Sequence, residues 1–371
     1  MRRTLIIGIQ ITFFFLGFSL SLMAQEKAAK PERTGKQLFE AACAACHGTD
    51  GRGAPASSLG FEIELPDFTD CVFTSREPND DWSAIIHYGG PMRSFNQMMP
   101  SFKDALSDEE INLILGHLRS FCKDDNWPRG ELNLPRPLIT EKAFPEDEAV
   151  LTFETPTEGL RSISQKLIYE RRFGARNQLE FALPFTLQER AKGSWIGGVG
   201  DIAMSYKRDV FHSINKGSMF SLGGEVSLPS GNKTLGLGGG GTVFEPFVAA
   251  AQLLPSAGFI QFQGGFELPA DRKATDEAFW RTAIGKSFMQ GGYGRSWSPM
   301  VELIGARELE TGAENEWDIA PQLQISLSKR QHILFNAGFR IPIGESKTRS
   351  TQFMMYVIWD WFDGGVFSGW W

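Results

Sequence analysis

The sequence predicts two domains of different class, an all-α domain followed by an all-β antiparallel barrel of about twelve strands. Residues 26–122 hold all four cysteines and three of the five histidines, and much of this stretch has helical spacing of apolar residues. From Val150 onward cysteine is absent, glycine and phenylalanine are frequent, and period-two patterns repeat. A proline-rich stretch lies between them. These observations predict a helical domain at 25–122, a linker at 123–149 and a barrel at 150–371.

The first 24 residues have the pattern of a secretory signal peptide. Two arginines near the start precede an apolar run from Leu5 to Met23, and Ala24 is followed by the polar Gln25. We therefore expect cleavage near Ala24, with no cysteine at the cut to make a lipoprotein. The run covers about 20 positions, so an uncleaved membrane anchor is the alternative. Polar residues within it, such as Gln10, weaken that alternative.

The charge of the chain bears on its partners. The formal net charge is -7 at pH 7, and the signal segment carries two arginines and no acid, so the exported chain is near -9. An acidic chain is repelled by phosphate backbones, which argues against a nucleic-acid partner. After Ala24 no apolar run approaches the length of a spanning helix.

Cys43, Cys46 and His47 form a C-x-x-C-H motif, the attachment pattern for c-type haem. Two thiols one helical turn apart reach the two vinyl groups of one porphyrin, and the adjacent imidazole becomes the proximal iron ligand. A thioredoxin-like redox pair does not need the histidine. A zinc site would need a second C-x-x-C, which the sequence lacks. The motif predicts one covalently bound haem c.

The residues around this motif sharpen the interpretation. The stretch from Gly35 to Pro55, GKQLFEAACAACHGTDGRGAP, and the later Met99-Pro100-Ser101-Phe102 followed by LSDEEI resemble class I cytochromes c. The resemblance covers about residues 34–122. It implies an N-terminal helix that runs into the motif, a glycine-rich loop after it and a closing helix. Ser107 and Glu110 form a capping box for that closing helix.

The same resemblance implies that Met99 is the distal iron ligand. Met92 and Met98 are the competing methionines, and His87 or His117 would instead give bis-histidine ligation. Histidine–methionine ligation raises the haem potential and leaves no open iron position. This favours an electron carrier over a catalyst. If the protein is an enzyme, we expect an oxidoreductase.

Cys71 and Cys122 are the two cysteines outside the motif. In an oxidising compartment two such cysteines in one small domain most often pair. We expect a disulfide that stabilises the domain by about 2–4 kcal/mol. Two buried thiols are the alternative.

The segment at 123–149 is rich in proline and charge. Its prolines interrupt both helix and strand hydrogen bonding and lie at Pro128, Pro135, Pro137 and Pro145. We therefore expect a semi-rigid linker.

The C-terminal part has alternating strands that are long. Period two continues over about 9–12 residues, whereas ordinary strands run about 5–6 and membrane-spanning strands about 9–11. The clearest examples lie at 179–187, 317–328, 333–343 and 353–361. One face is aromatic and apolar, and the other carries Glu180, Asp318 and Arg340, with Glu225, Glu267 and Glu302 expected to join it. Apolar-out and polar-in is the arrangement of an outer-membrane barrel.

The aromatic residues and the number of strands indicate how this barrel would lie in the membrane. Tryptophans suited to the two membrane interfaces occur at 280, 297, 317, 359 and 361. An even number of strands puts both termini in the periplasm. Short phrases at 198–202, 224–231 and 244–247 resemble an outer-membrane family named after a phenol-degradation pathway and often described as transporters. That resemblance implies the fold rather than a cargo.

Taken together, these patterns favour electron transfer through a single haem c held at the outer membrane by a fused barrel. The architecture is similar to fused cytochrome–porin proteins that pass electrons inward. A barrel of about twelve strands is too narrow to enclose a domain of about 90 residues. We therefore expect the cytochrome at the periplasmic side, with a periplasmic redox protein and outer-membrane lipid as partners.

Two other functions stay open at this point. One is a transport channel for small solutes, hydrophobic ones included, with the cytochrome as an accessory redox module. The other is a periplasmic cytochrome for which the barrel is only an anchor. A channel predicts polar lumen residues that converge on a ligand, whereas a conduit predicts haem reduction from outside.

Overall fold

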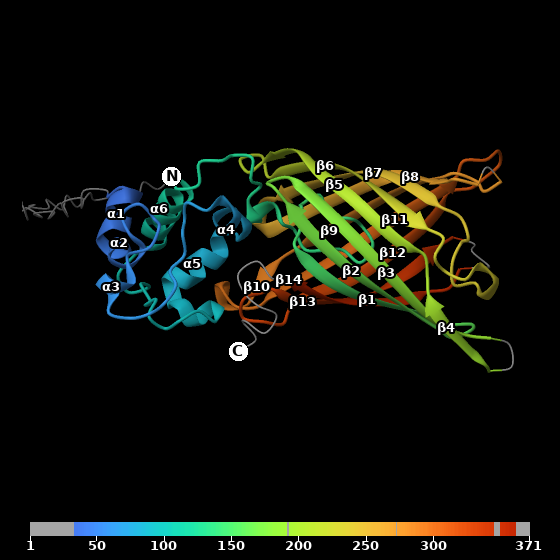
Figure 1. Cartoon of the computed structure of the whole chain (residues 1–371), viewed down its shortest axis with the longest axis horizontal. Helices are drawn as coiled ribbons and strands as arrows, with labels where there is room; N and C mark the ends of the chain where they lie inside the picture. The colour runs from blue at the N-terminus through green and yellow to red at the C-terminus, as the bar shows by residue number, and fades with distance from the viewer. Residues whose placement is uncertain (1–32, 191–192, 272, 345–348, 361–371) are drawn as a thin grey trace, which may run out of the picture. The chain divides into compact units, whose positions relative to one another are not determined.

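A computed structural model describes residues 33–190, 193–271, 273–344 and 349–360 (Figure 1). The chain divides into two compact units, Met1–Arg33 and Thr34–Trp371. All that follows concerns the second unit. The predicted signal peptide at 1–24 and Trp361 lie outside the described residues.

The first part of this unit is helical. Its elements are α1 (Gly35–Ala42), α2 (Ala44–His47), α3 (Ala56–Leu59), α4 (Cys71–Arg76), α5 (Asn79–Tyr88), η1 (Gly90–Arg93), α6 (Asp108–Arg119) and, further on, η2 (Gly130–Leu132). Helix α1 begins with a capping box between Thr34 and Gln37. Helix α6 begins with the predicted box between Ser107 and Glu110. In both boxes the side chains bond backbone N–H groups that the first helical turn leaves unpaired.

Helices α1 and α6 pack together to form the core of this domain. Leu38 and Phe39 from α1 and Ile111, Ile114 and Leu115 from α6 are at most 1% exposed. Gly35 permits the close approach, since a Cβ there would lie 2.0 Å from the backbone oxygen of Leu113. The predicted all-α domain is confirmed.

A disulfide joins Cys71, the first residue of α4, to Cys122, just after α6. The predicted bridge is therefore present. The disulfide links the segment that follows α6 to the start of α4.

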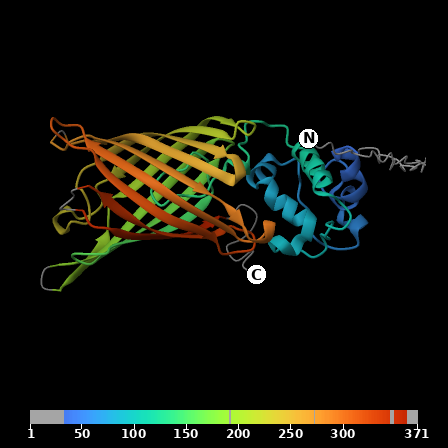
Figure 2. The same ribbon diagram turned by 180° about the vertical axis from the view of Figure 1, so that it is seen from behind.

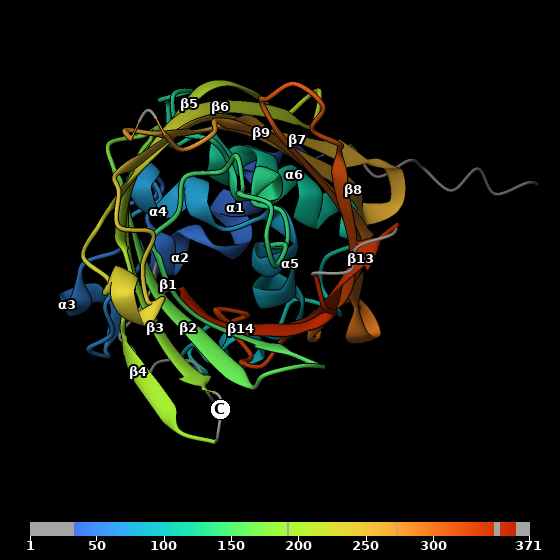
Figure 3. The same ribbon diagram turned by 90° about the vertical axis from the view of Figure 1, so that its right-hand side faces the viewer.

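The second part is a closed antiparallel barrel, seen along its axis in Figure 3. Among the described residues twelve long strands form the ring: β1 (Glu148–Pro156), β2 (Ser162–Phe173), β3 (Asn177–Glu189), β5 (Ile202–Ser213), β6 (Ser218–Leu228), β7 (Val243–Leu254), β8 (Gly258–Pro269), β9 (Glu277–Lys286), β11 (Ser296–Glu308), β12 (Glu316–Ser326), β13 (Ile333–Ile343) and β14 (Gln352–Asp360). Two short strands, β4 (Trp195–Val199) and β10 (Phe288–Met289), pair with β3 and β11. Pairing of β1 with β14 closes the ring from Glu148↔Asp360 to Pro156↔Gln352.

The two faces of the strands differ as predicted. Outward side chains such as Leu179 and Phe181 are 51% and 42% exposed. Inward polar side chains such as Glu302 and Lys207 are 0% and 1% exposed. A closed ring with an exposed apolar surface needs lipid to cover it, so this is an outer-membrane barrel. None of the helices in the described part of the chain is long and apolar enough to cross a membrane.

The two ends of the barrel have connections of different length. At the end where β1 begins and β14 ends, the strands are joined by short turns such as 174–176, 214–217 and 255–257. The other end carries longer connections, including 229–242 and 309–315. Figure 2 shows these longer loops at the end away from the chain's helical part. Outer-membrane barrels characteristically have short periplasmic turns and longer extracellular loops.

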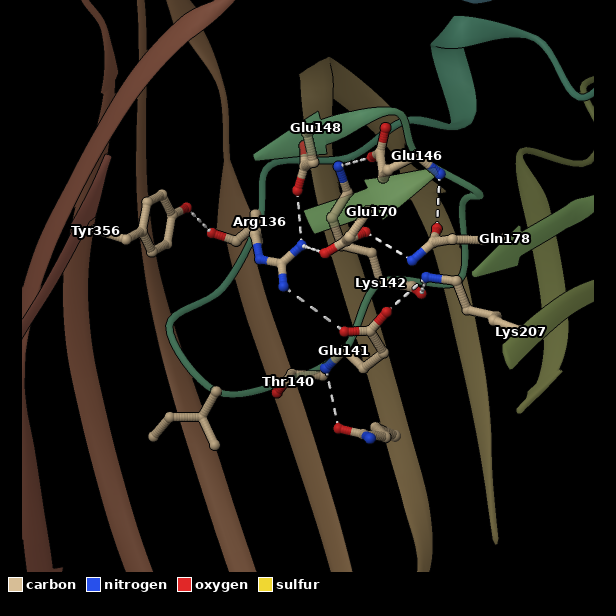
Figure 4. Close-up of polar contacts among 12 residues, drawn as sticks. Arg136, Thr140, Glu141, Lys142, Glu146, Glu148, Glu170, Gln178, Lys207 and Tyr356 are labelled. Atoms are coloured by element: carbon tan, nitrogen blue, oxygen red, sulfur yellow. Dashed lines mark hydrogen bonds and ion pairs between the residues drawn. The ribbon is translucent and has the colours of Figure 1, made fainter. Parts of the chain in front are cut away.

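Residues 133–147, which we call the lumen segment, run inside the ring of strands (Figures 3 and 4). Backbone N–H groups at Leu138, Thr140 and Glu141 donate to the side chains of Gln322, Glu302 and Gln263 over 2.9, 2.7 and 2.9 Å. Prolines keep the segment out of regular structure, so lumen side chains take over its backbone hydrogen bonding. The stretch predicted as a linker thus also fills part of the lumen.

Candidate functional site: the haem-attachment turn

The C-x-x-C-H residues occupy a single helical turn at the end of α1. Cys43 ends α1 and precedes α2, with its N–H bonded to the Phe39 carbonyl at 2.8 Å. The His47 N–H bonds the Cys43 carbonyl at 2.9 Å. Both thiols, of Cys43 and Cys46, are free and half-buried. The turn therefore presents two thiols and an imidazole together.

A glycine-rich loop folds back over this turn, as the cytochrome resemblance implies. The N–H groups of Gly53 and Ala54 bond the carbonyls of His47 and Cys46 at 2.9 and 2.7 Å. Gly51 has a φ of +77° and a Cβ there would lie 2.8 Å from the Phe121 ring. Only glycine meets both conditions without strain.

An apolar wall surrounds the turn. Cys43 and Met99 both pack against one cluster of buried residues that includes Phe39, Phe68 and Trp82. The His47 ring lies 5.1 Å from the Phe68 ring. Burial raises the pKa of the Cys43 thiol to about 11 and lowers the pKa of His47 below its usual value. Burial thus favours the neutral imidazole, which is the form that binds a metal.

The residues present fit a covalent haem. The Nδ1 atom of His47 is buried and has no hydrogen-bond partner in the described part of the chain. A buried imidazole with an unpaired ring nitrogen is costly unless a ligand uses it. The two nearby thiols and the apolar wall complete what a porphyrin requires.

The candidate distal ligands differ in their surroundings. Met99 lies in a loop at 89–99, which we call the distal loop, and its side chain packs against the same cluster as Cys43. Met98 is 49% exposed, and Met92 is half-buried within η1. The structure therefore brings Met99, rather than Met98, to the apolar wall beside the attachment turn.

The two other histidines of this domain, His87 and His117, have contacts of their own. The Nε2 atom of His87 lies 3.1 Å from a carboxylate oxygen of Asp108. His117 packs its ring against Phe39 and Phe121, with centroids 5.3 and 4.9 Å away. The Asp108 contact is that of a structural histidine, and the His117 ring packs in the core between α1 and α6.

Contacts between the distal loop and two barrel turns are a feature that sequence reasoning missed. Arg93 is 2% exposed, and it donates to Asp81 over 2.7 Å and to the Tyr293 carbonyl over 2.6 Å. Burial raises the pKa of Asp81 to about 6, with Glu77 adding to the rise and Arg93 opposing it. Arg93 and Tyr293 lie 200 residues apart in the chain, so no local pattern signals their contact.

A second missed feature is the ion-pair network between the lumen segment and the strands (Figure 4). The Arg136 guanidinium donates to Glu148 and Glu170 over 2.7 and 2.5 Å. Lys207 on β5 donates to Glu141 over 2.6 Å. Carboxylate oxygens of Glu141, Glu170 and Glu180 lie within 4.8 Å of one another, next to these cations. The network satisfies buried charges and fixes the lumen segment to the wall.

Comparison with known families addresses the helical domain. Residues 30–118 match the model of the family described as cytochrome c oxidase, cbb3-type, subunit III. The predicted cytochrome c domain is thereby confirmed for this part of the chain.

Comparison with solved structures addresses the barrel. An outer membrane channel from Pseudomonas putida F1 shares 12% sequence identity, covering 61% of this chain and 99% of its own, with a TM-score of 0.42. The NanC porin shares 8%, over 57% of this chain and 98% of its own, with a TM-score of 0.39. The β domain of the Bordetella autotransporter BrkA shares 14%, over 58% and 98%, with a TM-score of 0.37.

Proposed function

We propose that this protein transfers single electrons through one covalently bound haem c that its own barrel holds at the outer membrane. The observation that carries the proposal is the grouping of Cys43, Cys46, His47 and Met99 around one apolar wall. The thiols would form the thioether links, His47 would be the proximal ligand and Met99 the distal one. The haem, when bound, supplies one-electron redox chemistry.

The residues around the proposed haem favour electron transfer over catalysis at the iron. With His47 and Met99 both on the iron, no coordination position is open to a substrate. The buried aromatic side chains of Phe39, Phe68 and Trp82 would keep water away from the haem where it lies against this wall. Both features suit a carrier whose iron changes charge with little rearrangement. A carrier function fits these residues better than catalysis at iron.

The contacts and loop lengths support a periplasmic position for the cytochrome. Its distal loop contacts Tyr293 and Arg330, which lie in turns at the short-turn end of the barrel. Short turns characterise the periplasmic end. A periplasmic redox protein would then reach the haem, while lipid contacts the exposed apolar belt.

One observation favours the alternative function of a solute channel. Beyond the lumen segment, the inward face carries Glu225, Glu245, Glu267 and Arg281, a polar lining of the kind that wets a pore. The lumen segment stands in the path of that pore. Channel activity would therefore require the segment to move.

Haem attachment is the first experiment. Protein matured in a periplasm with haem-attachment machinery should keep a haem peroxidase stain on a denaturing gel, because thioether links survive denaturation. Cys43→Ala with Cys46→Ala should lose the stain, while Cys71→Ser with Cys122→Ser, which changes the same number of cysteines, should retain it. A colourless wild-type band would overturn the proposed function.

A further inference from the structure

Arg330 lies in the tight turn between β12 and β13 and reaches the distal loop of the cytochrome. Its Nε and Nη2 atoms donate to the carbonyls of Arg93 and Ser94 over 3.2 and 3.3 Å. Its guanidinium also lies 4.3 Å from the centre of the Phe95 ring. Three consecutive residues of the loop are thus held by one barrel side chain.

The turn that carries Arg330 is itself well fixed. The Ser328 hydroxyl accepts from the N–H groups of His332 and Ile333 over 3.1 and 3.2 Å. Gln331 adopts a φ of 64°, which tightens the reversal. A guanidinium on such a turn loses little freedom when it binds the loop, so its hydrogen bonds hold the loop effectively.

A second barrel turn fixes the same part of the loop. The Tyr293 carbonyl accepts from Arg93 over 2.6 Å, and the Tyr293 ring lies 5.0 Å from the ring of His87. Gln331 adds a long contact of 3.4 Å to the carboxylate of Asp81. Two barrel turns therefore contact the distal loop at Arg93 and the neighbouring helix α5 at Asp81 and His87.

Hydrogen bonds within the distal loop connect this held part to Met99. The Gly90 N–H donates to the Met99 carbonyl over 3.0 Å, and the Gly90 carbonyl accepts from Phe95 over 2.9 Å. The Met99 N–H bonds the Asn96 carbonyl at 3.2 Å. A Cβ on Gly90 would lie 2.2 Å from the Asn96 oxygen, so the two arms of the loop are in direct contact. Displacement of residues 93–95 is thereby transmitted to Met99.

We propose that Arg330 is a positioning residue for Met99, so that the barrel turn keeps the methionine on the haem iron. This inference rests on the proposed function, in which Met99 is the distal ligand. Without the guanidinium, residues 93–95 gain freedom, and the loop spends more time displaced from the iron. The barrel then does more than anchor the cytochrome, because the state of its turns sets how firmly the haem is ligated.

Competition with added imidazole tests the proposal on the full-length holoprotein in detergent. Imidazole replaces the methionine on ferric iron, and loss of the low-energy iron–sulfur absorbance band reports the exchange. Loss of two hydrogen bonds from a charged donor should make Arg330→Ala bind imidazole about tenfold more tightly than the wild type. Arg330→Lys, which keeps the charge but not the planar fork, should fall between them.

Lys329 supplies the matched control, because it lies in the same turn and is exposed. Lys329→Ala should titrate like the wild type. An imidazole affinity for Arg330→Ala equal to that of the wild type would overturn the inference. If Arg330→Ala fails to fold, as judged by haem content and heat-modified gel mobility, Phe95→Ala and Arg330→Lys decide, and wild-type affinity in both overturns it. Persistence of the iron–sulfur band in Met99→Ala would instead overturn the distal ligand of the proposed function.

Discussion

At the scale of single residues, the proposed haem site combines residues that lie close together in the sequence with one that is remote. Cys43, Cys46 and His47 lie within one five-residue motif, so helix geometry alone brings them together. Met99 is remote in sequence and reaches the same apolar wall as Cys43 through the fold of the distal loop. Its position as a ligand can therefore be tested separately from haem attachment.

Substitution of Met99 gives the first prediction. Met99→Ala should abolish the iron–sulfur absorbance band and lower the haem potential, because methionine sulfur favours the reduced iron. Met98→Ala is the matched control, since Met98 is 49% exposed, and it should keep both properties. The measurements are the absorbance spectrum of the ferric protein and a redox titration. A band lost in Met98→Ala and kept in Met99→Ala would reverse the assignment.

Asp81 gives a prediction about pH. Burial raises its pKa to about 6, above the ordinary value of 3.8, so the folded state binds the proton more tightly than the unfolded state. The stability that protonated Asp81 contributes is complete below about pH 4 and is lost as the pH rises to about 6, by up to about 3 kcal/mol. Arg93 and Gln331 bond this carboxylate, and Glu77 and His332 act on it electrostatically.

The test compares wild type with Asp81→Asn, which cannot titrate. Guanidinium unfolding of the cytochrome domain, followed by haem absorbance in detergent, should show that wild type loses stability relative to the variant between pH 4 and 6. Above about pH 7 the difference should be constant. Parallel curves across the whole range would mean that burial does not perturb this carboxyl.

At the scale of elements, local sequence patterns predicted helices and strands, but they did not predict contacts between residues far apart in the chain. The capping box at Ser107 and the alternation in β3, β12 and β13 are local patterns, and each predicted an element that the structure contains. The prolines of 133–147 correctly excluded helix and strand. They carried no information about the lumen side chains that bond this backbone, because those partners come from strands far along the chain.

The disulfide gives an element-scale prediction. Bridging residues 51 positions apart restricts the unfolded chain and should stabilise the domain by about 4 kcal/mol. Cys71→Ser with Cys122→Ser should lower the free energy of unfolding of the cytochrome domain by about this amount. Haem attachment should be unchanged, because Cys43 and Cys46 remain. Equal guanidinium midpoints for the two proteins would contradict the prediction.

The lumen segment gives a second prediction at the scale of elements. Glu302 accepts hydrogen bonds from Ile139 and Thr140 through three donors. Glu302→Ala should release the segment at a cost of about 3 kcal/mol and raise single-channel conductance in planar bilayers. Glu308→Ala is the matched control, because Glu308 lies on the same strand and is exposed. Unchanged conductance in Glu302→Ala would show that the segment does not obstruct the pore.

At the scale of the whole molecule, the composition changes near Val150, and the first strand of the barrel, β1, begins at Glu148. The contacts between the helical domain and the barrel could not be predicted from the sequence. The hydrogen bond from Arg93 to the Tyr293 carbonyl and the contacts from Arg330 form only when loops from both folds meet. An ion pair between Arg76 and Asp147 at 2.8 Å and a hydrogen bond between Glu77 and His332 at 3.2 Å add to these contacts. Such contacts depend on the assembled molecule.

The side from which electrons enter is the prediction that belongs to this scale. The cytochrome contacts the end of the barrel with short turns, and the apolar band of such barrels is about 25 Å tall. One haem at that end lies too far from the other side for direct exchange with a donor that cannot cross the membrane. In proteoliposomes, a membrane-impermeant reductant should therefore reduce haem at once only in molecules whose short-turn end faces it. Proteolytic accessibility of the cytochrome from the same side measures that fraction. In the wild type the reducible and protease-accessible fractions should agree. Rapid reduction of the protected fraction in wild type would establish a conduit through the barrel in place of a one-sided carrier.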